Sequence, residues 1–317
     1  MAQQINRIPA SPQTPAPIKV SLDDVSSDVL ADPFRMCLYG VPGVGKSSFA
    51  MGAPKPVFLD AERGTTKLRV KRYFVDTWPR FMAWLDALRT DRHDYQTVVI
   101  DTVDALEKML WLWMCATSGH KGIEDYGFGK GFTYALEHWR EAVYKIERLR
   151  LERGMNVIFL GHATIKGFND PEGEGYDRYQ MLLNDKAASL LKGWCETVLF
   201  ANYETWVKKE KKRPIGQSSG ARLIHTERTA AYDAKNRDNL PPILPLDWEE
   251  YEVAVARNAI SPAARLRAEI EELLTNASEE LREKCRATVA SNPDDERFLA
   301  RVINRLNANI TIQEKAA

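Results

Sequence analysis

The stretch Arg35–Ser47, RMCLYGVPGVGKS, decides the fold of this chain. It opens with a short apolar run that predicts a buried strand, and it continues as Gly40-Val41-Pro42-Gly43-Val44-Gly45-Lys46-Ser47. These eight residues match G-x-x-x-x-G-K-[ST] at every position, the loop whose main-chain amides cradle phosphate groups. SSFAMGA follows and predicts the start of a helix, whose N-terminus is a natural anion site.

The residue types of this loop indicate which ligand it holds. Glycines allow the dihedrals and the close approach that a phosphate needs. Lys46 would reach the β- and γ-phosphates, and the Ser47 hydroxyl would ligate Mg²⁺. A chance glycine turn is the alternative, and the strand before and helix after argue against it. We therefore expect ATP and Mg²⁺ as cofactors, held by Gly40, Val41, Pro42, Gly43, Val44, Gly45, Lys46, Ser47 and Ser48.

Asp101 is the second candidate magnesium ligand. It ends the strand Val98–Ile100, and the carboxyl end of a parallel strand faces the crevice where ligands bind. A carboxylate there anchors the metal directly or through water. The alternative is a helix N-cap, since Asp101 precedes Thr102 and a helix, and both roles are compatible.

Strand and helix patterns alternate along the rest of the chain, which predicts a parallel sheet with right-handed crossovers. We expect further strands at residues 56–62, 97–103 and 156–162, and helices at 81–90, from 105 to 153 with a break at 119–131, and near 186–192. Two later runs predict antiparallel strands joined by an exposed hairpin tip, at residues 196–207 and 221–232.

Composition divides the chain into three parts. Residues 1–30 are rich in Pro, Gln, Ser and Ala and predict a disordered tail. Residues 31–258 would form the nucleotide-binding core. Residues 259–317 would form a helical C-terminal domain, because Ser261-Pro262 is typical of a helix start and apolar residues then recur at helical spacing.

The overall composition is that of an ordinary soluble globular protein, with 44% apolar residues, 28% charged residues and zero formal net charge. There is no apolar stretch of the roughly 18 residues that a membrane span needs, and the N-terminus lacks a signal-peptide layout. We expect no membrane partner and a cytoplasmic location. The four scattered cysteines predict buried apolar side chains rather than a metal cluster or disulfides.

Several segments resemble the RecA-like ATPases. FLDAERG is similar to the strand end that carries the catalytic glutamate, which here is Glu62, and VVIDTVDAL looks like the second nucleotide motif. FLGH resembles the strand whose last polar residue, usually glutamine and here His162, senses the γ-phosphate. The resemblance covers roughly residues 34–245. It implies an ATPase with a RecA-like P-loop NTPase core. Together with the strand and helix pattern described above, the expected fold is of the α/β class, with a mainly parallel central sheet, an antiparallel extension and a small helical C-terminal domain outside the region of resemblance.

Ala234-Lys235-Asn236-Arg237, followed by Leu240-Pro241, resembles a motif of RecA and DnaB-type helicases. There the two basic residues reach the neighbouring subunit's nucleotide, which implies a homo-oligomer here and near-inactivity of an isolated subunit. Two apart on a strand, Lys235 and Arg237 would project to one face. The alternatives are a solvated basic edge for this pair, a surface side chain for Glu62 and a satisfied core histidine for His162.

GHATIK and YDAKNRDNLP look most like phage-encoded minimal RecA-like ATPases, which are linked to recombination and single-strand annealing. The resemblance implies two loops that contact single-stranded DNA, Gly127–Gly131 and about Thr164–Asp185. The second also carries Asp170, Glu172, Glu174 and Asp177, which repel phosphate, so a mobile loop ordered by nucleotide or by a neighbour is the alternative. The basic run Lys208–Arg213 is a third candidate contact, or else a solvated face.

The leading functional hypothesis is therefore an ATP-dependent recombination protein that binds single-stranded DNA as an oligomer and promotes annealing or strand exchange, with an ATPase that DNA stimulates. If the chain is phage-encoded, it would act in the cytoplasm of a prokaryotic host. Two alternatives use the same core: a ring-shaped helicase-type motor or loader, and an ATP-dependent mediator for a single-strand-binding protein.

Overall fold

The computed structural model describes Ser21, Val25 and residues 32–171, 173–210, 213–259, 262–275 and 277–316. The chain divides into two units, Met1–Asp32 and Pro33–Ala317. The expected disordered tail, residues 1–30, falls outside the described residues except for Ser21 and Val25.

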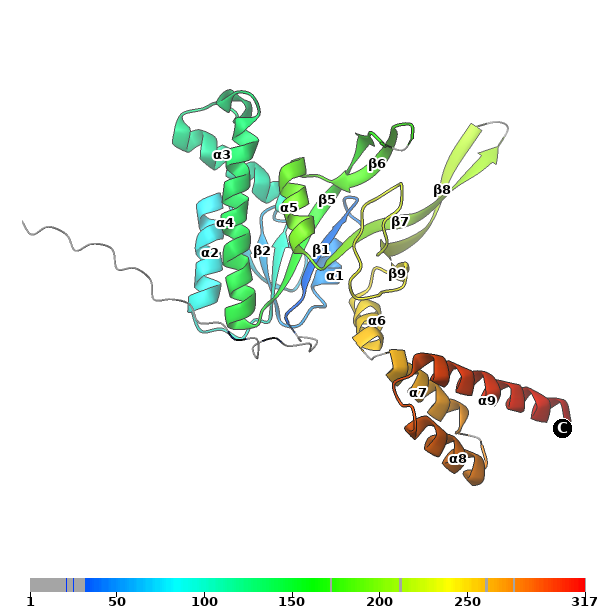
Figure 1. The fold of residues 1–317 in the computed structure, drawn as a ribbon. Coiled ribbons are helices and arrows are strands. Elements are labelled where there is room, and N and C mark those ends of the chain that lie inside the picture. Colours follow the sequence, from blue (N-terminus) through cyan, green and yellow to red (C-terminus); the bar gives the residue numbers. More distant parts are fainter. Residues whose placement is uncertain are drawn as a thin grey trace, which may run out of the picture. The chain divides into compact units, whose positions relative to one another are not determined.

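One sheet forms the centre of the nucleotide-binding core (Figure 1), with strand order β3-β2-β4-β5-β1-β7-β8-β9 and with β6 paired to β5. Along the part of this order that reads β3-β2-β4-β5-β1-β7, neighbouring strands run parallel. Strands β6, β8 and β9 pair antiparallel with their neighbours. The strands are β1 (Arg35–Gly40), β2 (Pro56–Asp60), β3 (Lys71–Phe74), β4 (Thr97–Asp101), β5 (Asn156–Phe168), β6 (Tyr176–Met181), β7 (Thr197–Glu210), β8 (Arg213–His225) and β9 (Ile243–Pro245). The predicted mainly parallel sheet with an antiparallel extension is confirmed.

Helices cover both faces of this sheet (Figure 1). Alternate strand residues point to opposite faces, so Cys37 and Tyr39 enter one apolar core while Met36 and Leu38 enter the other. The first core is closed by α2 (Trp78–Thr90), α3 (Val103–Ser118), α4 (Lys130–Arg153) and α5 (Asp185–Trp194). The second core is closed by α1 (Lys46–Ala50) and α6 (Trp248–Ala259). Strands buried on both faces explain the continuous apolar runs in the sequence.

The cysteines are buried, as the sequence predicts, and tryptophans pack in or against the first core. The four cysteines are buried and free. Trp139 is 1% exposed, and Trp111, Trp113 and Trp194 pack partly buried against the same core.

Some sequence-based expectations about the elements are wrong. His162 does not end its strand, because β5 continues to Phe168 and pairs with β6. The segment Thr164–Asp185 is therefore largely a β-hairpin rather than a loop. Strand β8 stops at His225, where its pairing with β9 ends, so residues 226–232 are not part of it. Lys235 makes only an isolated bridge with Val198, so Lys235 and Arg237 do not lie on a regular strand.

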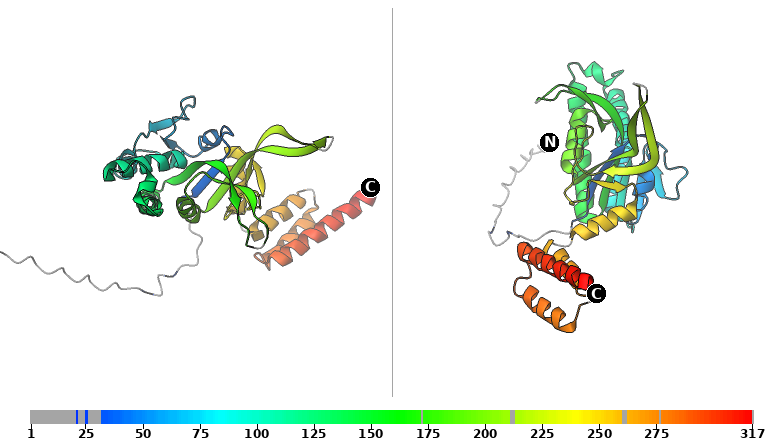
Figure 2. Two further views of the ribbon diagram at one scale, coloured as in Figure 1. Left: turned by 90° about the horizontal axis from the view of Figure 1, so that it is seen from above. Right: turned by 90° about the vertical axis from the view of Figure 1, so that its right-hand side faces the viewer.

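The C-terminal helices have an apolar core of their own. α7 (Pro262–Leu273), α8 (Glu279–Ala290) and α9 (Glu296–Ala316) enclose a cluster that shares no residue with the two cores on the sheet. Figure 2 shows these three helices packed beside one another. The boundary near residue 259 stays a prediction, because Pro33–Ala317 form one unit. Across the described residues, no helix has the length and apolar character needed to cross a membrane.

Three projections extend from the carboxyl-end side of the parallel strands (Figures 1 and 2). They are the connection from α3 to α4, which contains the short helix η2 (Ile123–Tyr126), the β5–β6 hairpin and the β7–β8 hairpin. The carboxyl ends of the parallel strands also carry the phosphate loop and Asp101, so the candidate ligand contacts gather at one end of the sheet.

Candidate nucleotide site

The phosphate loop leaves the sheet at Gly40, between β5 and β7, where Gly40 pairs with His162 and Ala201. A Cβ at Gly40 would lie 2.2 Å from the Ala201 carbonyl oxygen, so only glycine fits there. Gly43 and Gly45 adopt φ of 75° and 112°, which side-chain-bearing residues rarely do. The loop then enters α1 directly after Gly45, as the sequence predicts.

Lys46 lies inside the loop. It is 6% exposed, and its Nζ donates to the carbonyl oxygens of Gly40 and Val41, both at 3.2 Å. Burial lowers the pKa of Lys46, while the nearby carboxylates of Asp101, Asp104 and Glu62 oppose this effect. The ammonium is therefore held at the place where the motif requires a cation for phosphate.

Ser47 and Asp101 meet beneath the loop, as expected for a magnesium site. The Ser47 hydroxyl donates to Asp101 Oδ2 at 2.6 Å. Burial raises the pKa of Asp101 to about 6, partly offset by the hydrogen bond from Ser47. A hydroxyl and a carboxylate are hard oxygen donors, so these residues fit Mg²⁺. The N-cap of α3 is Thr102, whose side chain accepts from Ala105 N at 3.4 Å, so Asp101 is not the cap.

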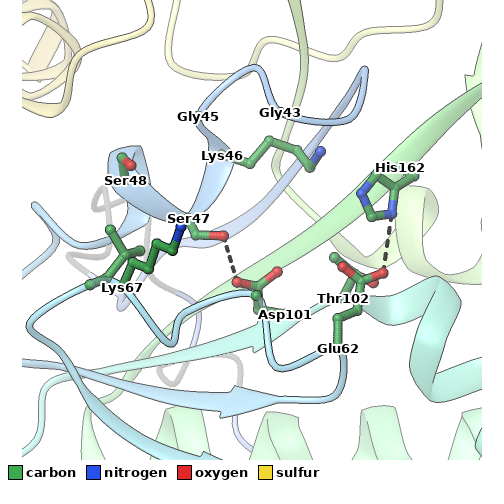
Figure 3. Close-up of a pocket in the computed structure, with 12 residues that line it drawn as sticks. Gly43, Gly45, Lys46, Ser47, Ser48, Glu62, Lys67, Asp101, Thr102 and His162 are labelled. Atoms are coloured by element: carbon green, nitrogen blue, oxygen red, sulfur yellow. Dashed lines mark hydrogen bonds and ion pairs between the residues drawn. The ribbon is translucent and has the colours of Figure 1, made fainter.

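A cavity opens beside the loop, and Figure 3 shows the side chains that line it. It brings Asp101, Glu62 and His162 together with part of the predicted loop, whereas Gly40, Val41, Pro42 and Val44 do not line it. Its lining also includes Lys67, an exposed cation that the sequence analysis did not single out. The lining residues are Gly43, Gly45, Lys46, Ser47, Ser48, Glu62, Gly64, Lys67, Leu68, Asp101, Thr102 and His162.

The segment after β2, which carries Glu62, is organised by a buried carboxylate at the end of that strand. Asp60 is 0% exposed, and its oxygens accept from the backbone amides of Glu62, Gly64 and Thr65 and from the Thr65 hydroxyl. These bonds fix the turn that presents Glu62 to the cavity. Asp60 was missed by the sequence analysis, although Asp before a Gly-Thr turn is a recognisable turn signal.

His162 faces two carboxylates across the cavity wall. Its Nδ1 lies 3.0 Å from Asp104 Oδ2 and 3.3 Å from Glu62 Oε1. Hydrogen bonds to Asp104 first and Glu62 second raise the pKa of His162 to about 9, against the effect of burial. The predicted pair Glu62 and His162 is thus brought together. Asp104 was missed, and its signal was its position three residues after Asp101 in the first turn of α3.

Lys235 and Arg237 do not line this cavity. Lys235 Nζ donates to the carbonyl oxygens of Lys192 at 3.3 Å, Gly193 at 3.1 Å and Cys195, which lie at the C-terminal end of α5. Arg237 is exposed and, within the described part of the chain, forms no ion pair. Arg237, unlike Lys235, therefore carries a charge that no described group of this chain pairs with.

The first candidate DNA loop is an exposed turn. Phe128 lies between Gly127 and Gly129, all three with positive φ, and its side chain is 104% exposed. Lys130 then begins α4. An aromatic ring with no packing partner and an adjacent cation have the composition of a base-stacking contact.

The second candidate DNA segment is less available. In the β5–β6 hairpin, Lys166 pairs with Asp185 at 2.9 Å, and Arg178 is buried against Asp233. The basic run is placed at the far end of the β7–β8 hairpin by the pairing of Lys208 with Ile215, and its side chains fall outside the described residues.

Together the fold and the site define a P-loop ATPase. Residues 32–238 match the family AAA_24, described as an AAA domain, so this chain belongs to that family. An uncharacterized protein derived from the SPbeta prophage of Bacillus subtilis (strain 168), YorG, is 28% identical over 148 residues, which are 44% of this chain and 43% of YorG. The chain thus matches less than half the length of that relative. The crystal structure of the RadB recombinase aligns with a TM-score of 0.34 and 10% identity, over 62% of this chain and 82% of that one.

Proposed function

We propose that this protein hydrolyses ATP with Mg²⁺, binds single-stranded DNA as a RecA-like oligomer and promotes annealing or strand exchange. Bound magnesium would neutralise phosphate charge during hydrolysis. Lys46 binds the β- and γ-phosphates, and Ser47 and Asp101 hold the metal. Glu62 orients the attacking water as general base. The Ser47–Asp101 bond of 2.6 Å, with Glu62 lining the same cavity, is the observation that supports the ATPase part.

Phe128 is the observation that carries the DNA part. Phe128 has a left-handed φ of 49°, a strained conformation of the kind that clusters at ligand-binding sites, and its ring is fully exposed. Every base has a flat face, so an aromatic ring binds single strands without sequence preference. Zero net charge gives no long-range attraction to DNA, which makes this local contact and Lys130 the more important.

Arg237 supports the oligomeric part of the proposal. Its guanidinium is exposed and unpaired within the described residues, and it does not line its own chain's cavity. A cation of this kind is suited to stabilise charge on a nucleotide bound by an adjoining copy. The bonds of Lys235 to the C-terminal end of α5 would then fix the position of the backbone just before Arg237.

The test is ATPase activity with and without single-stranded DNA, in the wild type and in Phe128→Ala. Stacking contributes roughly 1–3 kcal/mol per base, so the variant should bind DNA about tenfold or more weakly and lose stimulation while basal turnover stays unchanged. Tyr144→Ala, a change at an exposed aromatic on α4, is the matched control and should behave as wild type. Absence of DNA stimulation and of DNA binding at low salt in the wild type would overturn the proposal.

The C-terminal helices favour a second candidate, an ATP-dependent mediator for a single-strand-binding protein. Their separate core is what a partner-binding module needs. A pull-down with that protein, with and without residues 259–317, distinguishes the two functions. Electron microscopy with ATP separates both from a ring-shaped motor or loader, because closed rings indicate the motor and open filaments the recombinase. The prophage-derived relative supports a phage origin and hence action in a prokaryotic cytoplasm.

A further inference from the structure

A buried carboxylate stands behind His162 at the wall of the nucleotide cavity. Asp104 is 3% exposed and lies in the first turn of α3. Its Oδ1 accepts from His162 N at 2.9 Å, and its Oδ2 lies 3.0 Å from His162 Nδ1. Because both oxygens are engaged by one residue, Asp104 fixes the backbone of β5 at this point and the orientation of the ring together.

The same ring nitrogen also faces Glu62. Glu62 Oε1 is 3.3 Å from His162 Nδ1, so two carboxylates share one ring N–H. Only the backbone of Glu62 is tied to Asp60, and its side chain is held by the histidine. Two further charged groups act at this place. Lys46 disfavours the protonated form of His162. Asp101 acts on Lys46, as Asp104 and Glu62 also do.

The two contacts of the ring differ in strength. Asp104 is buried, makes a pair of bonds to His162 and sits on a helix. Glu62 is exposed, makes one longer contact and sits on a turn. An anion that enters the cavity and attracts the imidazolium therefore competes with Glu62 and leaves the contact with Asp104 in place.

We propose that Asp104 is a positioning residue: it anchors His162, which restrains the Glu62 carboxylate until the terminal phosphate of a bound nucleotide takes over the ring's charge. This inference rests on the proposed ATPase function. Glu62, once released, orients water, so the catalytic carboxylate is withheld while the γ-phosphate is absent. Asp104 does not line the cavity, so it would act through His162.

The first test needs no turnover. In the full chain with ¹⁵N-labelled histidine, the His162 signal is identified by its loss in His162→Gln and is titrated without nucleotide. Asp104→Asn should lower its pKa by about one unit or more, and Glu62→Gln by less. Glu141→Gln, at an exposed α4 residue, is the control and should leave it unchanged. An unaltered His162 titration in Asp104→Asn contradicts the proposal. If Asp104→Asn does not fold, an unaltered His162 titration in Glu62→Gln contradicts the proposal instead.

The second test separates positioning from structural support. Asp104→Asn should keep KM for ATP within a few-fold, lower kcat by about tenfold or more, and move the alkaline loss of activity to lower pH. A purely structural role would lower kcat and thermal stability without moving the pH profile, and that result would overturn the inference. If the wild type binds no nucleotide, the proposed function fails, yet the histidine titration still decides whether the ring is held as described.

Discussion

At the residue scale, Lys46 and Glu62 have separable roles. Lys46→Ala removes the cation that binds phosphate and should abolish nucleotide binding. Glu62→Gln keeps the shape of the side chain but not its basicity, so binding should persist while kcat falls by roughly 10²-fold or more. Equilibrium binding of a fluorescent ATP analogue and steady-state ATPase assays measure the two effects. Normal turnover in Glu62→Gln would show that Glu62 is a surface side chain without a catalytic role.

His162 also makes stability depend on pH. Its pKa is about 9 in the folded chain against an ordinary value of 6.5, because Asp104 and Glu62 favour the imidazolium. A raised pKa means that the folded state binds the proton more tightly. The stabilisation is therefore complete below pH 6.5 and is lost as pH rises to about 9. Chemical denaturation should show a difference between wild type and His162→Gln at pH 6 that shrinks by pH 9.5. An undiminished difference would contradict the ion pairing.

At the element scale, the conformation of the turn after β2 depends mainly on the hydrogen bonds that its backbone amides donate to Asp60. Asp60→Ala leaves its amide partners without their acceptor, and each unmet buried group costs about 1–3 kcal/mol. We expect a lower melting temperature and reduced kcat because Glu62 loses its place. Thr65→Val removes only the hydroxyl bond and should have a clearly smaller effect. Equal effects of the two variants on kcat would show that Asp60 does not organise this turn.

The elements also show what the sequence can and cannot specify. The strand β1, the phosphate loop and the strand ending at Asp101 were predictable, because buried parallel strands and the glycine motif leave local signatures. β6, with sequence YDRYQM, was not, because it is polar and owes its strand to pairing with β5. α6 was also missed, although Trp248 and Tyr251 pack it onto the sheet. Lys67 lines the cavity only through tertiary contacts, which spacing does not reveal, whereas the position of Asp104 three residues after Asp101 was a usable signal.

At the scale of the whole molecule, the account requires one copy to complete another's site. Specific ATPase activity should rise with protein concentration, and Arg237→Ala should lower kcat without weakening nucleotide binding. Mixing Arg237→Ala with Lys46→Ala should restore activity to about a quarter of wild type, since an active interface pairs an intact loop from the first variant with an intact Arg237 from the second. Failure of every mixture to recover activity would confine Arg237 to a role within its own subunit.

Every step proposed above requires the loop from Gly40 to Ser47 to hold a nucleoside triphosphate with magnesium. A crystal structure with a nonhydrolysable ATP analogue and Mg²⁺ shows whether it does. We expect phosphates among the loop amides and Lys46, the metal at Ser47 and Asp101, and Glu62 released from His162. A crystal grown with saturating analogue in which this cavity holds no nucleotide would contradict this expectation.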